Sequence, residues 1–389
     1  MKIAYIGDFI NHGKSLQTTG TPIVILLSLL DSVDSIDVFC PEENEITEEF
    51  ELPSKVRLLE FYRYNNSKSI IRLLKVQWRN YDVVIFNMLP TGVGDGTIAN
   101  ASALIVPILL VKLFRQNNIN IIYHNSVFTN NVQMLGYDSA FDKIRSFFLG
   151  IVEKILFKSV NTFVLLDLYK HRIDNILSKN RVQVLKSRYL ESITTLYINK
   201  VMDYESLKIE KSEILTVLLH GSWGPQKNIE LSLLALRNIR ESGIKFRLRV
   251  SGGINHHFPE YERKFQELLN SYSDVIDEYL GPISEKDIIQ IFLGANLLIL
   301  PYNSPGGHSG VLEQAIFFGV STIVMDFPEY REQAKGISNV KFVTIDNFYS
   351  ELVNCLEFLE DTKKININDK ITSALANIKQ LLAASTEKW

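Results

Sequence analysis

The sequence predicts an α/β protein made of two tandem, doubly wound parallel-sheet domains, and three observations predict this class. Short runs rich in β-branched residues alternate with helical patterns along the chain, as in proteins whose helices connect parallel strands. The strand-like runs are apolar throughout, which is typical of strands covered on both faces. The alternation stops at a polar, poorly patterned stretch, residues 186–212, and then begins again, so the 389 residues suit two domains.

Each domain has its own series of predicted strands. Those of the first domain are at 2–6, 35–40, 56–62, 82–88, 119–125, 162–166 and 182–185, and those of the second at 214–221, 246–253, 275–281, 296–302, 321–326 and 340–345. The first helix is expected to begin with Thr21 as its N-cap and Pro22 at its first helical position, where a missing N–H costs nothing. A linker around 190–212 then separates a domain of residues 1–195 from one of residues 205–369.

Composition and charge restrict the class of function. A net charge of −3 and a pI near 6.2 argue against a protein that neutralises nucleic-acid phosphates. Cys40 and Cys355 lie far apart without metal-ligand spacing, so a reducing compartment is expected. The N-terminus reads as a strand rather than a secretory signal, and the apolar run at 103–114, interrupted by Pro107 and Lys112, predicts a buried helix rather than a membrane span. These features predict a cytoplasmic protein without a nucleic-acid partner.

The segment HGSWGPQKN, residues 220–228, is a candidate anion site. It follows a predicted strand and precedes a helix, which is where open α/β sheets bind ligands. Gly221 and Gly224 have no side chain, so the backbone of this segment can adopt conformations that other residues disfavour. Lys227 stands near the helix start, where the helix dipole disfavours a cation unless an anion lies between them. The alternative is a surface lysine on a glycine turn.

The segment SPGGHSGVLEQA, residues 304–315, is a second candidate anion site. Its small residues form a loop after a predicted strand, and the helix that begins near Val311 presents unpaired N–H groups to this loop. Glu313 lies on that helix among apolar residues, where a carboxylate is costly unless it is hydrogen-bonded. The vicinal hydroxyls of a ribose would provide two hydrogen bonds. A structural lysine or arginine beside Glu313 is the alternative.

Two further candidates lie in the first domain. His124 ends a predicted strand, from where it could transfer a proton or donate a hydrogen bond to a transition state. A structural role is the alternative, and the more frequent one for a lone histidine. The long loop at 7–20 adds Asp8, Gly13 and Lys14, and a loop of this length in a compact domain is either functional or disordered.

The helix expected at 142–158 is amphipathic. Apolar residues stand at 144, 147, 148, 151, 152, 155 and 156, and basic residues at 143, 145, 154 and 158. We favour a helix that turns its apolar face to the core of the first domain. A helix that lies on an anionic membrane explains the same pattern.

These motifs resemble a known family. Two tandem Rossmann-like domains resemble the GT-B architecture, and the motifs of the second domain, strongest over 214–332, are similar to those of retaining glycosyltransferases of family 4. The resemblance implies that Lys227, after the glycine turn at Gly221 and Ser222, binds the donor diphosphate. It implies that Glu313 is the second glutamate of the family's E-x7-E motif and binds the donor ribose.

The resemblance has further implications for the site. The loop residues Ser309, Gly310 and Val311 would hold the diphosphate through backbone N–H groups, and Gly13 would belong to the donor site. His124 matches a histidine that the family places beside the donor sugar. Backbone groups near Ile283 would contact the base. The C-terminal helix, residues 370–389, would pack on the first domain.

The sequence also departs from the family's pattern. Pro305 stands where the first glutamate of the motif should contact the transferred sugar, and we expect His308 to take over part of this recognition. The basic residue often found shortly before the diphosphate lysine is replaced at Ser222. Arg249 or Lys14 would then have to match the second phosphate charge.

The function implied by the resemblance is sugar transfer with retention at the anomeric carbon. The donor would be a UDP- or GDP-sugar and the acceptor a glycan or a lipid-linked molecule. No metal or other cofactor is expected, because the architecture lacks an Asp-x-Asp site. Peripheral membrane contact through 142–158 would place the protein at the inner face of the membrane. The alternatives are a non-catalytic GT-B protein that binds a nucleotide or glycan for a partner, and a nucleotide-sugar epimerase or hydrolase.

Overall fold

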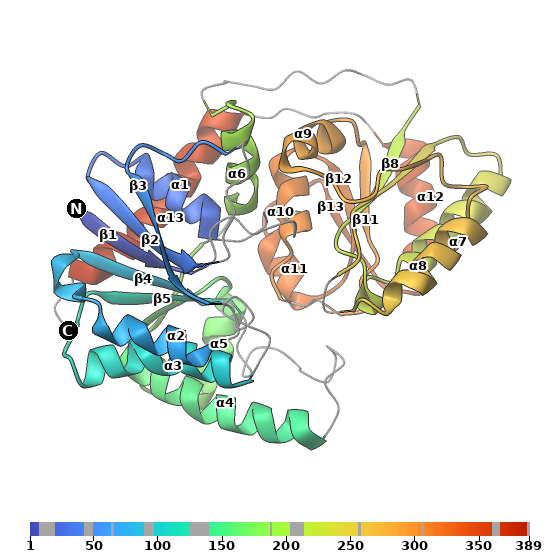
Figure 1. Ribbon diagram of the computed structural model, residues 1–389. Coiled ribbons are helices and arrows are strands. Elements are labelled where there is room, and N and C mark those ends of the chain that lie inside the picture. Colours follow the sequence, from blue (N-terminus) through green and yellow to red (C-terminus); the bar gives the residue numbers. More distant parts are fainter. Residues whose placement is uncertain are drawn as a thin grey trace. The chain divides into compact units, whose positions relative to one another are not determined.

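The protein consists of two compact units, each with one parallel sheet. The computed structural model describes residues 1–7, 20–42, 50–63, 66–88, 97–124, 140–186, 189–202, 214–255, 258–304, 307–359 and 366–386. Unit 1 comprises Met1–Ile198 with Ile371–Trp389, and unit 2 comprises Asn199–Lys370. Both sheets are parallel and carry helices (Figure 1), so the predicted α/β class with two doubly wound sheets is confirmed.

Unit 1 is built on a seven-stranded sheet with the order β3-β2-β1-β4-β5-β6-β7. The strands are β1 (Lys2–Ile6), β2 (Ser35–Pro41), β3 (Val56–Tyr62), β4 (Val83–Met88), β5 (Ile119–Tyr123), β6 (Asn161–Val164) and β7 (Val182–Val184). β1 pairs in parallel with both β2 and β4, and the strand order reverses there. The carboxyl ends of β1 and β4 therefore mark the switch point, where sheets of this kind bind ligands.

Helices cover both faces of the unit 1 sheet (Figure 1). On one face lie α2 (Ser67–Ile71), α3 (Thr97–Lys112), α4 (Ala140–Ser159) and α5 (Asp167–Ile176), with the 3-10 turns η1 (Arg72–Lys75) and η2 (Trp78–Asn80) after α2. On the other lie α1 (Gly20–Ser28), α6 (Leu190–Ile198) and α13 (Ile367–Thr386). The first residues of α13 belong to unit 2. Farther along α13, the Leu381 carbonyl accepts a 2.8 Å hydrogen bond from the Asn120 side chain.

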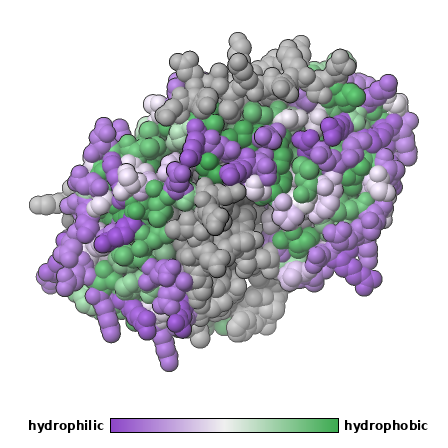
Figure 2. All heavy atoms as spheres, turned by 45° about the horizontal axis from the view of Figure 1, so that its top comes forward, coloured by the Kyte–Doolittle hydropathy of each residue, from purple (hydrophilic) through white to green (hydrophobic). Residues whose placement is uncertain are grey.

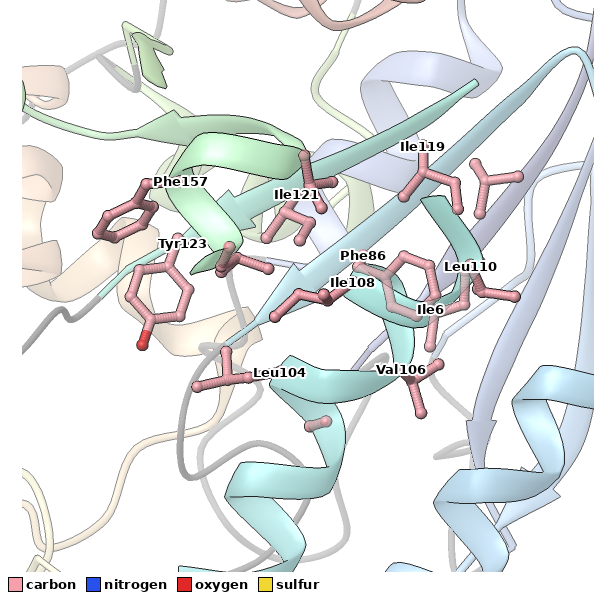
Figure 3. Packing of buried hydrophobic residues seen from close by; sticks show 14 of the residues in the cluster. Ile6, Phe86, Leu104, Val106, Ile108, Leu110, Ile119, Ile121, Tyr123 and Phe157 are labelled. Atoms are coloured by element: carbon pink, nitrogen blue, oxygen red, sulfur yellow. The ribbon is translucent and has the colours of Figure 1, made fainter. Parts of the chain in front are cut away.

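The core of unit 1 between the sheet and α3–α4 is apolar. Figure 3 shows side chains of two helices packed on those of three strands: Leu104, Val106, Ile108 and Phe157 on Ile6, Phe86 and Ile121. Burial of such surface is the main favourable term in folding. The run at 103–114 forms the predicted buried helix, with Pro107 inside α3, although Leu113 and Phe114 beyond its end are exposed.

Unit 2 is built on a six-stranded sheet with the order β10-β9-β8-β11-β12-β13. The strands are β8 (Thr216–His220), β9 (Arg247–Ser251), β10 (Glu278–Tyr279), β11 (Leu297–Leu300), β12 (Ser321–Met325) and β13 (Val340–Val343). The helices α7 (Ile229–Glu241), α8 (Tyr261–Ser271) and α12 (Phe348–Phe358) cover one face, and α9 (Glu285–Leu293), α10 (Gly310–Phe317) and α11 (Pro328–Gln333) the other (Figure 1). The strand order reverses between β8 and β11, so the switch point of this sheet lies at their carboxyl ends.

Three local predictions were wrong. α1 begins at Gly20, so Thr21 is its second residue rather than its cap. A helix, α6, occupies the first part of the stretch expected to be a linker, and it buries Leu190, Ile193 and Leu196 at a spacing of three. The helix at 142–158 forms within α4, but much of its apolar face is turned to solvent instead of the core.

The surface of each unit is otherwise of the usual mixed kind. On the face shown in Figure 2, hydrophilic side chains cover much of the outer surface, with hydrophobic residues scattered between them. Among the described stretches of the chain, no helix is long and apolar enough to cross a bilayer.

Candidate functional site

Four loops at the carboxyl edge of the unit 2 sheet contact one another. The Asn303 N–H, after β11, donates to the carbonyl of Gln226, after β8, at 2.9 Å. The Gly252 N–H, after β9, donates to the carbonyl of Gly281, after β10, at 2.6 Å. A Cβ atom at Gly252 would stand 1.8 Å from the Gly221 carbonyl oxygen, so only glycine permits this approach. The two candidate anion segments therefore lie on neighbouring loops at the switch point.

The turn after β8 is held by Trp223. Its indole N–H donates to the Ser251 carbonyl at 3.1 Å, its backbone N–H donates to the Gly253 carbonyl at 2.7 Å, and its ring stacks on Phe265. Trp223 is therefore a buried structural residue, while its neighbour Ser222 is exposed. The turn carries no cation in place of the family's basic residue.

Lys227 is the basic residue of the turn after β8. It ends the 3-10 turn η3 (Pro225–Lys227), and its Nζ lies 3.6 Å from the centroid of the Tyr302 ring. Such an ammonium–ring contact stabilises the charged form. Burial nevertheless lowers the pKa of Lys227 to about 8. No carboxylate among the described residues forms an ion pair with Lys227, so the positive charge is available to an anion.

Two buried groups next to Lys227 were not predicted from the sequence. The pKa of His220 is lowered to about 4 by burial and by the nearby Lys227 charge, so this ring is neutral at pH 7, and its Nδ1 lies 2.9 Å from Ser251 Oγ. The Tyr302 hydroxyl faces Gly221, where an added Cβ would lie 3.6 Å away. This hydroxyl is buried without a hydrogen-bond partner among the described residues, and burial raises its pKa. A buried polar group of this kind is costly unless a ligand binds it.

The start of α10 presents backbone donors. Ser309 is its N-cap, and the Ser309 hydroxyl accepts from the Leu312 N–H at 3.3 Å. The N–H groups of Gly310 and Val311 have no hydrogen-bond partner among the described residues. Unpaired N–H groups at a helix start attract anions through hydrogen bonds and through the helix dipole. The resemblance assigned diphosphate binding to these residues.

Glu313 is buried in the first turn of α10, with 1% of its surface exposed. Its Oε2 lies 3.0 Å from Nε2 of His308. The sequence left a lysine or arginine partner open, but the basic side chain that lies against Glu313 in the structure is a histidine. His308 was expected to contact the sugar. It lies instead beside Glu313, the carboxylate to which the resemblance assigns ribose binding.

Gln333, at the end of α11, holds the same loop and was missed by sequence reasoning. Its Oε1 accepts from the Ser309 N–H at 3.1 Å, and its Nε2 donates to the Ser309 carbonyl at 2.7 Å. The same Nε2 lies 3.1 Å from Nε2 of His308. Both backbone groups of Ser309 are therefore fixed by one side chain, which keeps the start of α10 in place.

The other predicted residues of unit 2 have mixed outcomes. Ile283 is partly buried at the start of α9, two residues after Gly281, which contacts Gly252. Arg249, one of the two expected substitutes for the missing cation, donates to Glu278 of the neighbouring strand at 2.7 Å, so its charge is already matched. Pro305 lies outside the described residues.

In unit 1, His124 directly follows β5 at the carboxyl edge of the sheet and is buried. Its Nε2 lies 2.7 Å from Oδ1 of Asn87 in β4. Asn87 also packs closely on Gly7, the residue after β1, where a Cβ would stand 2.9 Å from the Asn87 carbonyl. His124 therefore lies at the switch point of its own sheet. Asp8, Gly13 and Lys14 lie outside the described residues.

Comparison with known proteins identifies the fold. No model of a known family matches the chain, and no curated protein is similar to it in sequence. Solved structures are similar over almost the whole length. Sucrose-phosphate synthase from Thermosynechococcus elongatus has a TM-score of 0.64 at 12% identity, covering 99% of this chain and 96% of that one. WaaG, a glycosyltransferase involved in lipopolysaccharide biosynthesis, has a TM-score of 0.57 at 14% identity, covering 99% and 96%.

Two more solved structures are similar in the same way. HepE from Anabaena, in complex with UDP-glucose, has a TM-score of 0.60 at 12% identity, covering 98% of each chain. UDP-GlcNAc 2-epimerase from Methanocaldococcus jannaschii has a TM-score of 0.55 at 15% identity, covering 96% of this chain and 98% of that one. The chain therefore has the GT-B fold. These neighbours include both transferases and an epimerase, so the fold leaves the reaction open.

Proposed function

We propose that the protein is a retaining glycosyltransferase that moves a hexose from a UDP- or GDP-sugar to a glycan or lipid-linked acceptor without a metal ion. The observation that carries this proposal is the cluster at the unit 2 switch point. A lysine with a lowered pKa, an unpartnered tyrosine hydroxyl and the open N–H groups of Gly310 and Val311 lie on loops that are joined by hydrogen bonds. This set of groups suits a nucleoside diphosphate.

The cluster would act mainly by electrostatic stabilisation of the leaving group. Lys227 and the N–H groups at the start of α10 would bind the departing diphosphate in a site of low dielectric, and such preorganised groups are effective there. The Tyr302 hydroxyl would donate to a phosphate oxygen, since its raised pKa keeps it protonated. Tyr302 would thus partly compensate for the absent basic residue at Ser222.

The ribose and the sugar would be held by other groups. Glu313 would accept hydrogen bonds from the two ribose hydroxyls, which replace its contact with His308. The released His308 ring would then be available to the transferred sugar. His124 would orient the sugar and stabilise the developing cation through a hydrogen bond.

An epimerase or hydrolase is the second candidate, because an epimerase is among the structural neighbours. Both reactions need the same nucleotide site but no acceptor. If the protein is a transferase, nucleotide release must depend on an acceptor.

Incubation of the protein with a panel of UDP- and GDP-sugars, with and without acceptor extracts, tests this function. We expect nucleotide release that requires extract and is lost in Glu313→Gln. Glu267→Gln, which alters an exposed carboxylate of α8, is the control and should leave release unchanged. Release of the same size without extract would favour the hydrolase, and a sugar isomer without release would favour the epimerase. Nucleotide binding without any turnover would favour a non-catalytic partner protein.

The same proposal places the protein in the cytoplasm, at the inner face of the membrane when the acceptor is lipid-linked. The cytoplasm supplies nucleotide-sugars and a reducing environment for Cys40 and Cys355, which are not joined in a disulfide. Fractionation of cells that express the tagged chain would test this location.

A further inference from the structure

Helix α4 of unit 1 exposes a row of large apolar side chains. The exposed fractions are 58% for Ile144, 67% for Phe147, 61% for Phe148, 43% for Ile151 and 40% for Ile155. The spacings of three and four residues place all five on one face of the helix. Single exposed apolar residues are common, but a contiguous apolar row marks an interaction site.

This row is not the side that α4 uses for folding. Leu156 and Phe157, on the opposite side of the helix, are fully buried in the core of unit 1. Phe157 also packs edge-on against Tyr123 of β5. Because α4 already has a buried apolar side, the exposed row adds nothing to the core.

Basic residues accompany the exposed row. Lys154 and Lys158 are exposed toward the end of α4, and by helical spacing they follow Ile151 on the same side. The neighbouring helix α3 ends at the exposed Lys112, and the exposed residues 113–115 follow it, so that the stretch reads KLFR. α3 packs on α4, and both helices lead into parallel adjacent strands, β5 and β6, so their last turns lie at the same edge of the sheet. We call the α4 row, Lys154, Lys158 and residues 112–115 together the α3–α4 face.

Among the residues of α3 and α4 whose side chains the structure describes, none that is exposed is acidic; Asp142, in the first turn of α4, lies outside this set. Between 97 and 116 and between 144 and 160 the one carboxylate is Glu153, which is 1% exposed and accepts a 2.6 Å hydrogen bond from the Tyr123 hydroxyl. The α3–α4 face is therefore apolar and cationic, although the whole chain has a net charge of −3. The positive charge is local to this face.

An anionic bilayer fits both properties better than a second copy of the chain. In a twofold dimer each copy presents the same surface, so the basic residues of this face would meet their own equivalents and like charges would face each other. A bilayer surface accepts apolar side chains at the level of the acyl chains, and its anionic headgroups attract lysines and arginines at the edge. α4 is not apolar enough to span a membrane, so it would lie in the plane of the interface.

We propose that the α3–α4 face docks on the surface of an anionic lipid bilayer, with the α4 row inserted among the acyl chains and the basic residues at the headgroups. This inference does not depend on the proposed transferase activity, since it uses no residue of the unit 2 site.

Co-sedimentation of the full chain with vesicles tests the proposal. We expect binding to vesicles that contain phosphatidylglycerol, weaker binding at high salt, and little binding to vesicles of phosphatidylcholine alone. Phe147→Ser combined with Phe148→Ser should weaken binding by roughly tenfold or more, and Lys154→Gln combined with Lys158→Gln by a similar factor for the anionic vesicles. Phe358→Ser is the matched control, because Phe358 is 74% exposed on unit 2, and it should bind as the unchanged protein does.

Thermal unfolding would show that the variants fold, which is expected because the altered side chains are exposed. Equal binding to neutral and anionic vesicles would overturn the proposal, as would unchanged binding of the double-phenylalanine variant. A dimer in light scattering that this variant abolishes would overturn it in favour of a second copy. Nucleotide binding should be the same in all these variants, so failure here is distinct from failure of the proposed function.

Discussion

The two sheets of the protein have the same doubly wound design but carry different chemistry at their switch points. At the edge of the unit 2 sheet, a lysine with a lowered pKa, an unpartnered buried hydroxyl and open helix N–H groups lie on loops that contact one another. At the edge of the unit 1 sheet, the described groups include His124 and Asn87, whose Nε2 and Oδ1 atoms lie 2.7 Å apart. The fold provides the position in both cases, and the residues of the loops determine which chemical groups stand there.

The largest effect is expected from loss of the unit 2 cation. Lys227→Met should lower kcat/KM for the nucleotide-sugar by about 100- to 1,000-fold, because it removes the side-chain charge that we propose meets the leaving diphosphate. Steady-state kinetics with the active donor would measure this. Lys264→Met is the control, since Lys264 is exposed on α8 of the same unit. An equal loss of kcat/KM in both variants would mean that activity depends on the positive charge of the unit in general rather than on Lys227.

A change in unit 1 should separate turnover from nucleotide binding. His124→Ala should reduce kcat by about 100-fold, the lower end for a residue that transfers or donates a proton, and leave the Kd of the nucleoside diphosphate unchanged. Calorimetry and kinetics on the same preparation would measure both. His171→Ala, at an exposed position of α5, should change neither. A parallel loss of affinity in His124→Ala would contradict the division of roles between the units.

The ribose assignment can be sharpened with a deoxy ligand. Glu313→Gln should weaken nucleoside diphosphate binding by roughly 10- to 100-fold, the range for a hydrogen bond to a charged group. The protein with Glu313 should bind the 2′-deoxy nucleotide less tightly than the ribonucleotide, and the variant should not distinguish the two. Discrimination that survives in Glu313→Gln would show that another residue reads the ribose.

The smallest effect expected is a shift in pH dependence. Lys227 is charged below its pKa of about 8 and neutral above it, so affinity for a nucleoside diphosphate should fall as the pH rises through about 8. Tyr302→Leu removes the ring that stabilises the charged form, and the midpoint should move down by up to about one pH unit. Tyr302→Phe keeps the ring and should keep the midpoint. A midpoint that is the same in Tyr302→Leu would contradict the cation–ring contact, and an unchanged profile in Lys227→Met would exclude Lys227 as its origin.

Sequence patterns predicted the sheets well because parallel strands covered on both faces must be apolar throughout. Every strand of both sheets lies at a predicted run. Helix α6 was missed because its threonines and its flanking polar residues hide an apolar spacing of three. The solvent-facing side of α4 was assigned to the core because periodicity identifies an apolar face but does not identify what covers it.

The sequence predicted only those residues of the candidate site that come after a strand or stand at the start of a helix. Lys227, Ser309 and Glu313 stand in such positions. Tyr302 lies inside the run predicted as a strand, and Gln333 ends a helix, so neither position indicates a role in the site. Their roles depend on contacts with residues far along the chain: Tyr302 lies under Lys227, and Gln333 binds Ser309. The partner of Glu313 could not be predicted from the local sequence pattern either, because basic residues at several positions could have lain beside it.

A structure of the chain with its nucleoside diphosphate would test the central claim most directly. We predict the diphosphate between Lys227 Nζ and the N–H groups of Gly310 and Val311, with the ribose hydroxyls on Glu313 in place of His308. A nucleotide bound elsewhere, or one that leaves the Glu313–His308 pair intact and does not contact Lys227, would contradict the account.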